Sequence, residues 1–196
     1  MLVTPALPEN GPVTRIVGGL ARGRRLRVPK GGTRPTSDQA REALFNTLAG
    51  LVELDGSRVL DLYAGSGAVG LEALSRGART AVLVESDAGA ARAITANAAE
   101  LELTGAVLVG TTVERYLGTA PAEPFDAVFA DPPYALAEDD LAAALRRLAA
   151  PGWVRSAGIV VLERSARSPG PEWPDALEPV KRKRYGDTAL WYRRKI

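Results

Sequence analysis

The chain has 196 residues, which suits one domain that buries about 70% of the surface of its unfolded chain. A hydrophobic content of 46% and a charged content of 24% are ordinary for a globular protein. Cysteine and histidine are both absent, which excludes disulfides and thiolate nucleophiles and removes the usual zinc ligands and the commonest general base. No apolar run approaches the roughly 18 residues of a membrane span, and the N-terminus lacks a signal pattern, so we expect a cytoplasmic protein.

The net charge of +2 conceals a strong polarity along the chain. Residues 1–34 and 181–196 together hold 14 basic and two acidic side chains, whereas residues 35–180 hold 11 basic and 21 acidic ones. Two basic flanks on an acidic body favour a polyanionic partner over merely solvated ends.

The N-terminal part of the chain predicts a short arm followed by a helix. Residues 1–12 contain prolines and no periodicity, which predicts disorder. Residues 14–17 and 25–28 alternate polar and apolar side chains around a glycine-containing link, which predicts a β-hairpin. Thr36 and Gln39 have the spacing of a capping box, so a helix should follow and end near Gly50. We therefore expect residues 13–50 to form a basic hairpin arm with the first helix.

Residues 51–196 predict an α/β domain of the Rossmann-like type. Continuous apolar strands alternate with helical segments, which is typical of a parallel sheet covered on both faces. A hairpin signal, Gly186-Asp187, joins two last strands and completes a mostly parallel seven-stranded sheet. The expected strands are 58–63, 80–84, 106–109, 125–130, 158–162, 180–185 and 188–193. The expected helices are 68–76, 88–103, a short one near 113–117, and 136–149.

The segment RVLDLYAGSGAVG, residues 58–70, joins a strand, a glycine turn and the start of a helix. Its three glycines, Gly65, Gly67 and Gly70, fit the dinucleotide-binding fingerprint, because residues without Cβ permit positive φ and close approach to a ligand. Asp61 lies on the strand before this turn. Either it binds a cationic or hydroxyl-rich ligand, or neighbouring backbone N–H groups satisfy it. The pattern predicts a nucleotide-type binding site.

Two further signals lie at the ends of other predicted strands. Glu85 ends the second central strand, where a carboxylate can accept hydrogen bonds from both hydroxyls of a ribose. Asp131-Pro132-Pro133-Tyr134 follows the fourth strand, and its prolines fix the backbone so that the carbonyls of Asp131 and Pro132 have no competing internal partner. Tyr134 offers a flat face on which a base can stack.

DLYAGSG, together with Glu85 and DPPY, resembles the class I S-adenosylmethionine-dependent methyltransferases that act on exocyclic amino groups. The segment TRIVGGLARGRRLRVPKGGTRPTSDQAREALFN and the terminal YGDTALWY resemble the bacterial 16S ribosomal RNA guanine-N2 methyltransferases of the RsmD type. The likeness covers about residues 14–192. The chain departs from it at Gly110–Val113, where many relatives carry an acid near the adenine.

The resemblance implies an enzyme that methylates the exocyclic N2 of a specific guanine in 16S ribosomal RNA, with S-adenosylmethionine as methyl donor. It implies a monomer that acts on this RNA, either alone or within the small ribosomal subunit or an assembly intermediate. No metal and no membrane partner are expected. The catalytic residues it implies are Asp131, Pro132 and Tyr134. The cofactor-binding residues it implies are Asp61, Tyr63, Ala64, Gly65, Gly67, Glu85, Ser86, Thr112 and Val113. The expected RNA-binding residues are Arg15, Arg24, Arg25, Arg27, Arg34, Arg41, Lys181 and Lys183.

Other functions stay open at this point. An amino-methyltransferase acting on another RNA base, on DNA or on a protein glutamine would share the fold, although the basic flanks disfavour a protein substrate. A nicotinamide-dependent dehydrogenase would explain the glycines but not DPPY, and a non-catalytic RNA-binding protein would explain the charge but not the acids at the strand ends. Without cysteine, covalent methylation of a pyrimidine C5 is excluded.

Overall fold

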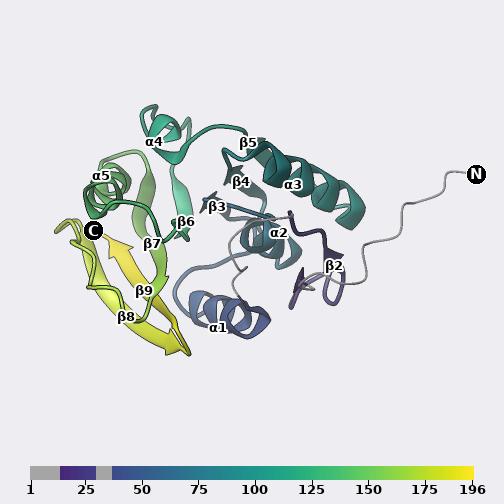
Figure 1. Ribbon diagram of the computed structural model, residues 1–196, viewed down its shortest axis with the longest axis horizontal. Coiled ribbons are helices and arrows are strands. Elements are labelled where there is room, and N and C mark those ends of the chain that lie inside the picture. The colour runs from purple at the N-terminus through teal and green to yellow at the C-terminus, as the bar shows by residue number, and fades with distance from the viewer. Residues whose placement is uncertain (1–13, 30–36) are drawn as a thin grey trace, which may run out of the picture.

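The computed structural model describes residues 14–29 and 37–196 (Figure 1). The predictions for residues 1–12 and for Arg34 therefore lie outside the described residues. The first helix, α1, Asp38–Leu48, is capped by Ser37, whose hydroxyl accepts from the Ala40 N–H at 3.1 Å, and not by Thr36 as predicted. The predicted hairpin forms from β1, Thr14–Arg15, and β2, Arg25–Leu26, which pair antiparallel. Both strands are shorter than expected, because the chain between them turns away to contact the body of the protein.

The predicted seven-stranded, mostly parallel sheet is confirmed, with the strand order β5-β4-β3-β6-β7-β9-β8. The central strand β3 pairs in parallel with β4 on one side and β6 on the other, and β7 pairs in parallel with β6. Strands β8 and β9 form the expected antiparallel hairpin at one edge. The strands are β3, Arg58–Leu62; β4, Thr80–Val84; β5, Ala106–Val109; β6, Phe125–Ala130; β7, Val154–Ser165; β8, Leu177–Tyr185; and β9, Thr188–Lys195.

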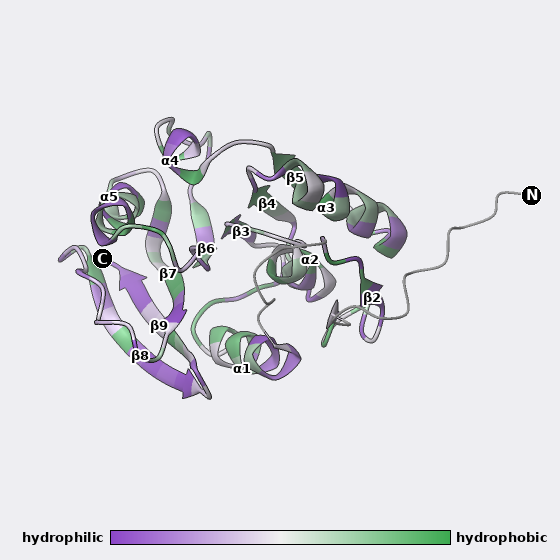
Figure 2. Ribbon diagram, in the orientation of Figure 1, coloured by the Kyte–Doolittle hydropathy of each residue, from purple (hydrophilic) through white to green (hydrophobic). Residues whose placement is uncertain are grey.

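Helices cover both faces of the sheet, and each face has its own hydrophobic core. Alternate side chains of each strand point to opposite faces, so Val59 packs with α1, α2 and α3, whereas Leu60 packs with α4 and α5. In Figure 2 the hydrophilic colour is strong along β8 and β9 at the edge of the sheet. Among the described residues, no helix has the length and apolar character to cross a membrane. The helices are α1, Asp38–Leu48; α2, Ala68–Ser75; α3, Ala88–Leu101; α4, Val113–Tyr116; and α5, Glu138–Ala149.

Several elements differ from their predicted bounds for local reasons. Helix α3 ends two residues early because Glu102 takes a left-handed conformation with φ of 56°. Helix α5 begins two residues late because the N–H of Leu136 is bonded to the Pro133 carbonyl in the preceding turn. Strand β7 begins four residues early, and a bulge containing Ala157 at φ 65° interrupts its pairing with β6.

The arm shares its hydrophobic core with the body of the protein. Ile16, Ala21 and Leu26 are buried in the same cluster as residues of α1, α2 and α3. Gly19 lies so close to α2 that a Cβ there would meet the Ser75 carbonyl oxygen at 1.8 Å, and its φ of 77° also favours glycine. We propose that the arm and α1 form a unit folded onto the domain of residues 51–196, because they contribute side chains to one core.

Glu72 of α2 is a fully buried carboxylate that joins the arm, α1 and α2. Its Oε2 accepts hydrogen bonds from the Val17 N–H and from Nε of Arg41, each at 3.2 Å. Its Oε1 accepts from Arg76, with the Nη2 atom at 2.7 Å. Arg41 is also fully buried, and it donates to Asp38 at 2.8 Å and to the Arg15 carbonyl. The buried charges are therefore paired, which a low-dielectric interior requires.

Replacing Glu72 should destabilise the protein strongly, because Glu72→Ala removes the fully buried carboxylate that pairs with the fully buried Arg41 guanidinium. We expect the free energy of unfolding in urea to fall by about 3–5 kcal/mol. Glu42→Ala, at an exposed position of α1, should change it by less than about 0.5 kcal/mol. The double variant Arg41→Met/Glu72→Leu should recover much of the loss, since neither charge then remains buried. A loss below about 1 kcal/mol in Glu72→Ala would show that the pair contributes little.

Candidate functional site

Three strands end side by side at one edge of the sheet, and each is followed by a predicted site residue. Leu62 of β3 pairs with Val84 of β4 and with Ala130 of β6. The next residues along these strands are Tyr63, Glu85 and Asp131, respectively. The carboxyl edge of the parallel strands therefore brings together the glycine turn, Glu85, which is expected to bind a ribose, and the DPPY segment, as the sequence predicts.

The glycine turn adopts a conformation that suits glycine. Gly65 and Gly67 have φ of 56° and 78°, and Gly67 caps the start of α2 with its N–H bonded to the Ala64 carbonyl at 2.7 Å. A Cβ on Gly70 would approach the Cδ2 atom of Leu83 at 2.8 Å, so this glycine permits close packing of α2 on β4. Tyr63 also has a positive φ, 60°, although it is not glycine, and such strain is common where a backbone is shaped for function.

Asp61 lies beneath this turn, with only 2% of its surface exposed. Its Oδ2 accepts a hydrogen bond from the Gly70 N–H at 2.8 Å. Burial raises the pKa of Asp61 to about 8; the Gly70 bond opposes this shift, and the charge of Glu85 adds to it. Of the two interpretations made from the sequence, the structure shows one element of the second, a backbone N–H bound to one of the two carboxyl oxygens. An ionised Asp61 would need a nearby cation.

Glu85 is anchored by the backbone on both sides. Its Oε2 accepts from the Gly65 N–H at 2.8 Å, and its Oε1 accepts from the Asp87 N–H at 2.7 Å. Asp87 in turn caps α3 by accepting from the Ala90 N–H. A carboxylate has about four acceptor positions, so Glu85 can accept further hydrogen bonds, such as those of two hydroxyl groups. Its half-buried side chain is held in one orientation beside the turn.

The DPPY segment continues from β6 at the same edge. The Asp131 N–H faces the Leu62 carbonyl at 3.5 Å, and the Asp131 side chain is half-buried. Pro132 is buried, whereas Tyr134 exposes 76% of its surface. A large aromatic side chain so exposed beside a rigid proline pair can stack on a planar ligand.

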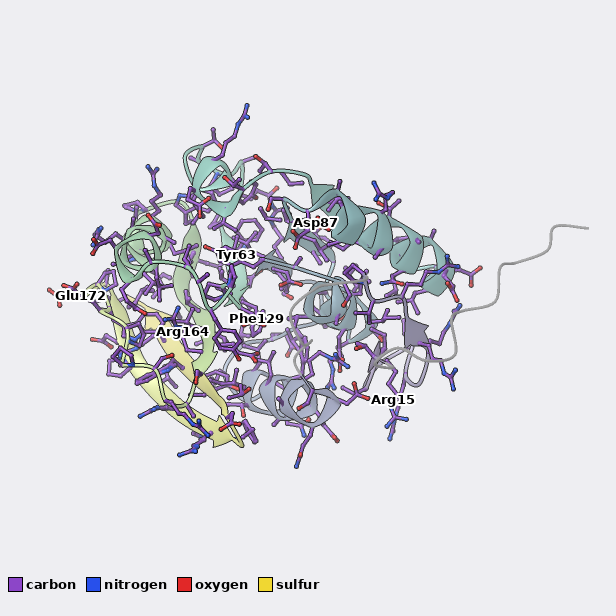
Figure 3. The ribbon with its side chains drawn as sticks, in the orientation of Figure 1. Arg15, Tyr63, Asp87, Phe129, Arg164 and Glu172 are labelled. Carbon is purple, nitrogen blue, oxygen red and sulfur yellow. The ribbon has the colours of Figure 1, made fainter. Side chains whose placement is uncertain are left out.

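The other predicted cofactor-binding residues lie at this edge, but their side chains differ in how far they are exposed and in whether they are already hydrogen-bonded. Figure 3 marks Tyr63, and its buried hydroxyl has no hydrogen-bond partner within the described part of the chain. Burial, with Glu114 and Asp140 nearby, raises the pKa of this phenol to about 12. Ala64 and Val113 are buried, Ser86 is exposed, and the Thr112 hydroxyl caps α4 by accepting from the Arg115 N–H at 3.3 Å. Within residues 14–29 and 37–196, no three metal-ligating side chains lie together.

The predicted RNA-binding cations divide into two groups in the structure. Lys181 and Lys183 pair with Tyr192 and Leu190, so they lie on the face of the sheet that α1 covers. On the arm, Arg25 is exposed, and Arg15, Arg24 and Arg27 remain at the surface while binding Asp38 or Glu100. The structure argues against RNA contact by Arg41, because this side chain is fully buried in the Glu72 ion pair.

The turn of the arm lies farther from the site than the sequence suggests. The Leu20 N–H bonds the Ser75 carbonyl, at the end of α2 opposite to the glycine turn. Eight helical residues correspond to about 12 Å. The predicted cations of the arm are therefore not all close to the strand ends, and the part near Arg27 is the one linked to the glycine turn, through Asn97.

Sequence reasoning missed Asn97, which is buried in α3 with 1% of its surface exposed. It bonds the backbone of Arg27 in the arm and the Ser66 carbonyl in the glycine turn. The available signal was its position, because Ala90, Ile94, Asn97 and Leu101 follow the helical spacing of a buried face.

The raised pKa of Asp61 predicts a pH-dependent stability. The folded protein keeps this proton up to a pH of about 8, whereas the unfolded chain loses it near 3.8, so rising pH removes stability within that window. Relative to Asp61→Asn, which does not titrate, the free energy of unfolding of the parent should fall by up to about 1.4 kcal/mol per pH unit and level off above pH about 9. Urea titrations of both proteins across this range measure it, with Asp175→Asn as an exposed control. A difference independent of pH would contradict the assignment.

Comparisons with known proteins agree with this geometry. A family model described as conserved hypothetical protein 95 matches residues 14–194. The chain is 37% identical over 163 residues to ribosomal RNA small subunit methyltransferase D of Escherichia coli K12, covering 82% of this chain and 79% of that protein. A solved structure from Escherichia coli, named as a candidate methyltransferase, superposes with a TM-score of 0.83 at 33% identity and covers 93% of this chain and 98% of the other. A hypothetical protein of Thermus thermophilus superposes with a TM-score of 0.78 at 41% identity over 92% and 98% of the two chains. The chain therefore belongs to the conserved hypothetical protein 95 family, as its sequence, fold and strand-end residues all indicate.

Proposed function

We propose that this protein transfers the methyl group of S-adenosylmethionine to the exocyclic N2 of a guanine in 16S ribosomal RNA. One observation carries the proposal: an anchored ribose-type carboxylate and a DPPY segment flank the same glycine turn at the ends of three paired strands. The relative named ribosomal RNA small subunit methyltransferase D supports the choice of substrate.

The residues at the strand ends fit the methyl donor. Glu85 keeps acceptor positions for the two ribose hydroxyls while the backbone fixes its orientation. The turn at Gly65 and Gly67 lets the backbone approach the amino-acid end, and the buried Asp61 carboxyl gains a reason to ionise when a cation lies near it. We assign the adenine to the segment after β5 that contains Thr112 and Val113. When bound, S-adenosylmethionine supplies a methyl group already activated on a sulfonium.

The DPPY segment supplies acceptors for the target amino group. Guanine N2 is a weak nucleophile, because its lone pair is delocalised into the ring. Hydrogen bonds from its two protons to the Asp131 carboxylate and the Pro132 carbonyl favour a pyramidal nitrogen whose lone pair faces the methyl group. The rate of methyl transfer then depends mainly on how the guanine nitrogen is positioned relative to the methyl group. The proton released after transfer passes to Asp131 or to water.

The surface around this edge fits a nucleic-acid substrate. The exposed Tyr134 ring can stack on the extruded guanine or on its neighbour. Lys181 and Lys183 on β8, with the arm arginines, provide positive charge for phosphates on the face covered by α1. A ribosomal RNA substrate places the protein in the cytoplasm, where we expect it to act as a monomer on RNA that is free or within the small subunit.

Glu85→Ala should weaken binding of S-adenosylmethionine by about 1.5–3 kcal/mol, roughly 10- to 150-fold, because two charge-assisted hydrogen bonds to the ribose are lost. Isothermal titration calorimetry measures the change. Glu42→Ala, an exposed glutamate distant from the strand ends in sequence, should bind like the parent. Equal affinity in Glu85→Ala and the parent would show that the ribose does not bind to the Glu85 carboxylate.

Asp131→Ala should reduce methyl transfer to 16S ribosomal RNA by at least about a hundredfold, with nearly unchanged cofactor affinity, because the acceptor that orients the amino group is removed. Single-turnover transfer of a radiolabelled methyl group, followed by mass spectrometry of the modified nucleoside, tests both the rate and the site. Asp139→Ala, in the exposed first turn of α5, is the matched control. Near-normal turnover in a folded Asp131→Ala protein would exclude this assignment, and a methylated base other than guanine would exclude the substrate.

A further inference from the structure

Asn97 uses its side-chain amide to join two parts of the protein that the proposed function assigns to different ligands. Its Oδ1 accepts from the Arg27 N–H at 2.8 Å, and its Nδ2 donates to the Arg27 carbonyl at 3.0 Å. The same Nδ2 donates to the Ser66 carbonyl, also at 3.0 Å. One buried side chain thus binds the backbone of the basic arm and the backbone of the cofactor turn.

The Ser66 end of this link lies in a peptide segment that two glycines flank. Ser66 lies between Gly65 and Gly67, and both glycines have positive φ. Without Cβ atoms, such residues can rotate to other conformations at little steric cost. Two side chains hold the turn from outside: Glu85 accepts from the Gly65 N–H, and Asn97 donates to the Ser66 carbonyl. The orientation of the turn therefore depends on Asn97 as well as on Glu85, the carboxylate expected to bind the ribose.

The Arg27 end of the link responds to the arm. Bonding both the N–H and the carbonyl of one residue imitates a strand pairing, so displacement of Arg27 breaks two hydrogen bonds together. The Arg27 side chain contacts Glu100 at 3.3 Å, one helical turn beyond Asn97, and Arg24 donates to the Glu100 carbonyl. An RNA phosphate that binds beside Arg24 and Arg27 therefore acts on the same segment of the arm that Asn97 holds.

We propose that Asn97 is a positioning residue that couples RNA binding on the arm to cofactor binding at the glycine turn. RNA bound to the arm stabilises the arrangement in which Arg27 lies against Asn97, and Asn97 in turn holds the Ser66 carbonyl in the orientation that receives the cofactor. By linkage, the cofactor must strengthen RNA binding by the same factor. The inference rests on the proposed function, since it takes ribosomal RNA and S-adenosylmethionine as the two ligands.

The first experiment uses the parent protein. The affinity for S-adenosylhomocysteine, which binds without allowing turnover, is measured with and without saturating unmethylated 16S ribosomal RNA. The RNA is presented as a bare transcript and within small ribosomal subunits from cells lacking the protein. Whichever form of the RNA binds to the protein, we expect it to raise the affinity for S-adenosylhomocysteine about fivefold or more, a usual size for coupling between sites. The affinity ratio is the affinity for S-adenosylhomocysteine with RNA divided by that without RNA. If the protein binds both ligands and this ratio is one, the inference is overturned and the proposed function remains intact. A protein that binds neither form of RNA would contradict both.

The second experiment removes the link. Asn97→Asp keeps an acceptor for the Arg27 N–H but loses both donations, and Asn97→Ala loses all three hydrogen bonds. In each variant the affinity ratio should fall towards one. Asn46→Ala, at an exposed position of α1, should keep the ratio of the parent. A merely structural Asn97 would lower stability or both affinities and leave the ratio unchanged, so an unchanged ratio in folded Asn97→Asp would refute the coupling. If Asn97→Ala does not fold, Asn97→Asp and the parent still decide the matter.

Discussion

The buried ion pair between Glu72 and Arg41 is the constraint on which the joining of arm, first helix and domain depends. A carboxylate without solvent requires donors on both oxygens, and Glu72 obtains them from Arg41, Arg76 and the Val17 N–H. These donors come from three separate parts of the chain. The arm is thus fixed to the domain by a polar requirement as well as by the apolar contacts of Ile16 and Leu26. Together with the contacts of Leu20 and Arg27 to α2 and α3, this pairing fixes the arm on the domain.

The site combines rigid elements with one adaptable element. Buried strands in register set the separation of Glu85 and Asp131, because β3 pairs with β4 on one side and β6 on the other. The glycine turn between them has few steric restraints of its own. Besides its own hydrogen bond from the Gly67 N–H to the Ala64 carbonyl, it is held by Glu85 and Asn97 on neighbouring elements. The positions of Glu85 and Asp131 are thus set by the sheet, whereas the conformation of the turn depends on its hydrogen bonds.

The sequence predicted the sheet well because buried parallel strands are continuous apolar runs bounded by glycines and charges. Three strands, β4, β5 and β6, have the predicted bounds. The burial of Arg41 could not be predicted, since a lone arginine on a helix resembles a solvated residue and its partner Glu72 is 31 residues away. The link through Asn97 was equally hidden, because it depends on how α3 packs against Arg27, 70 residues earlier. The extension of β7 depends on a bulge at Ala157, an unusual residue for positive φ.

The cations of β8 also affect aggregation, because this strand lies at the edge of the sheet. This nine-residue strand is the last in the sheet order, so one side of its backbone has no neighbouring strand within the described sheet. An exposed strand of this length invites pairing with another molecule, and charged side chains along it oppose such pairing. The four consecutive cations from Lys181 to Arg184 therefore keep the edge apart from other copies of the chain. At the opposite edge, β5 has only four residues and offers little backbone for pairing. Substitutions that remove these cations are consequently limited by solubility.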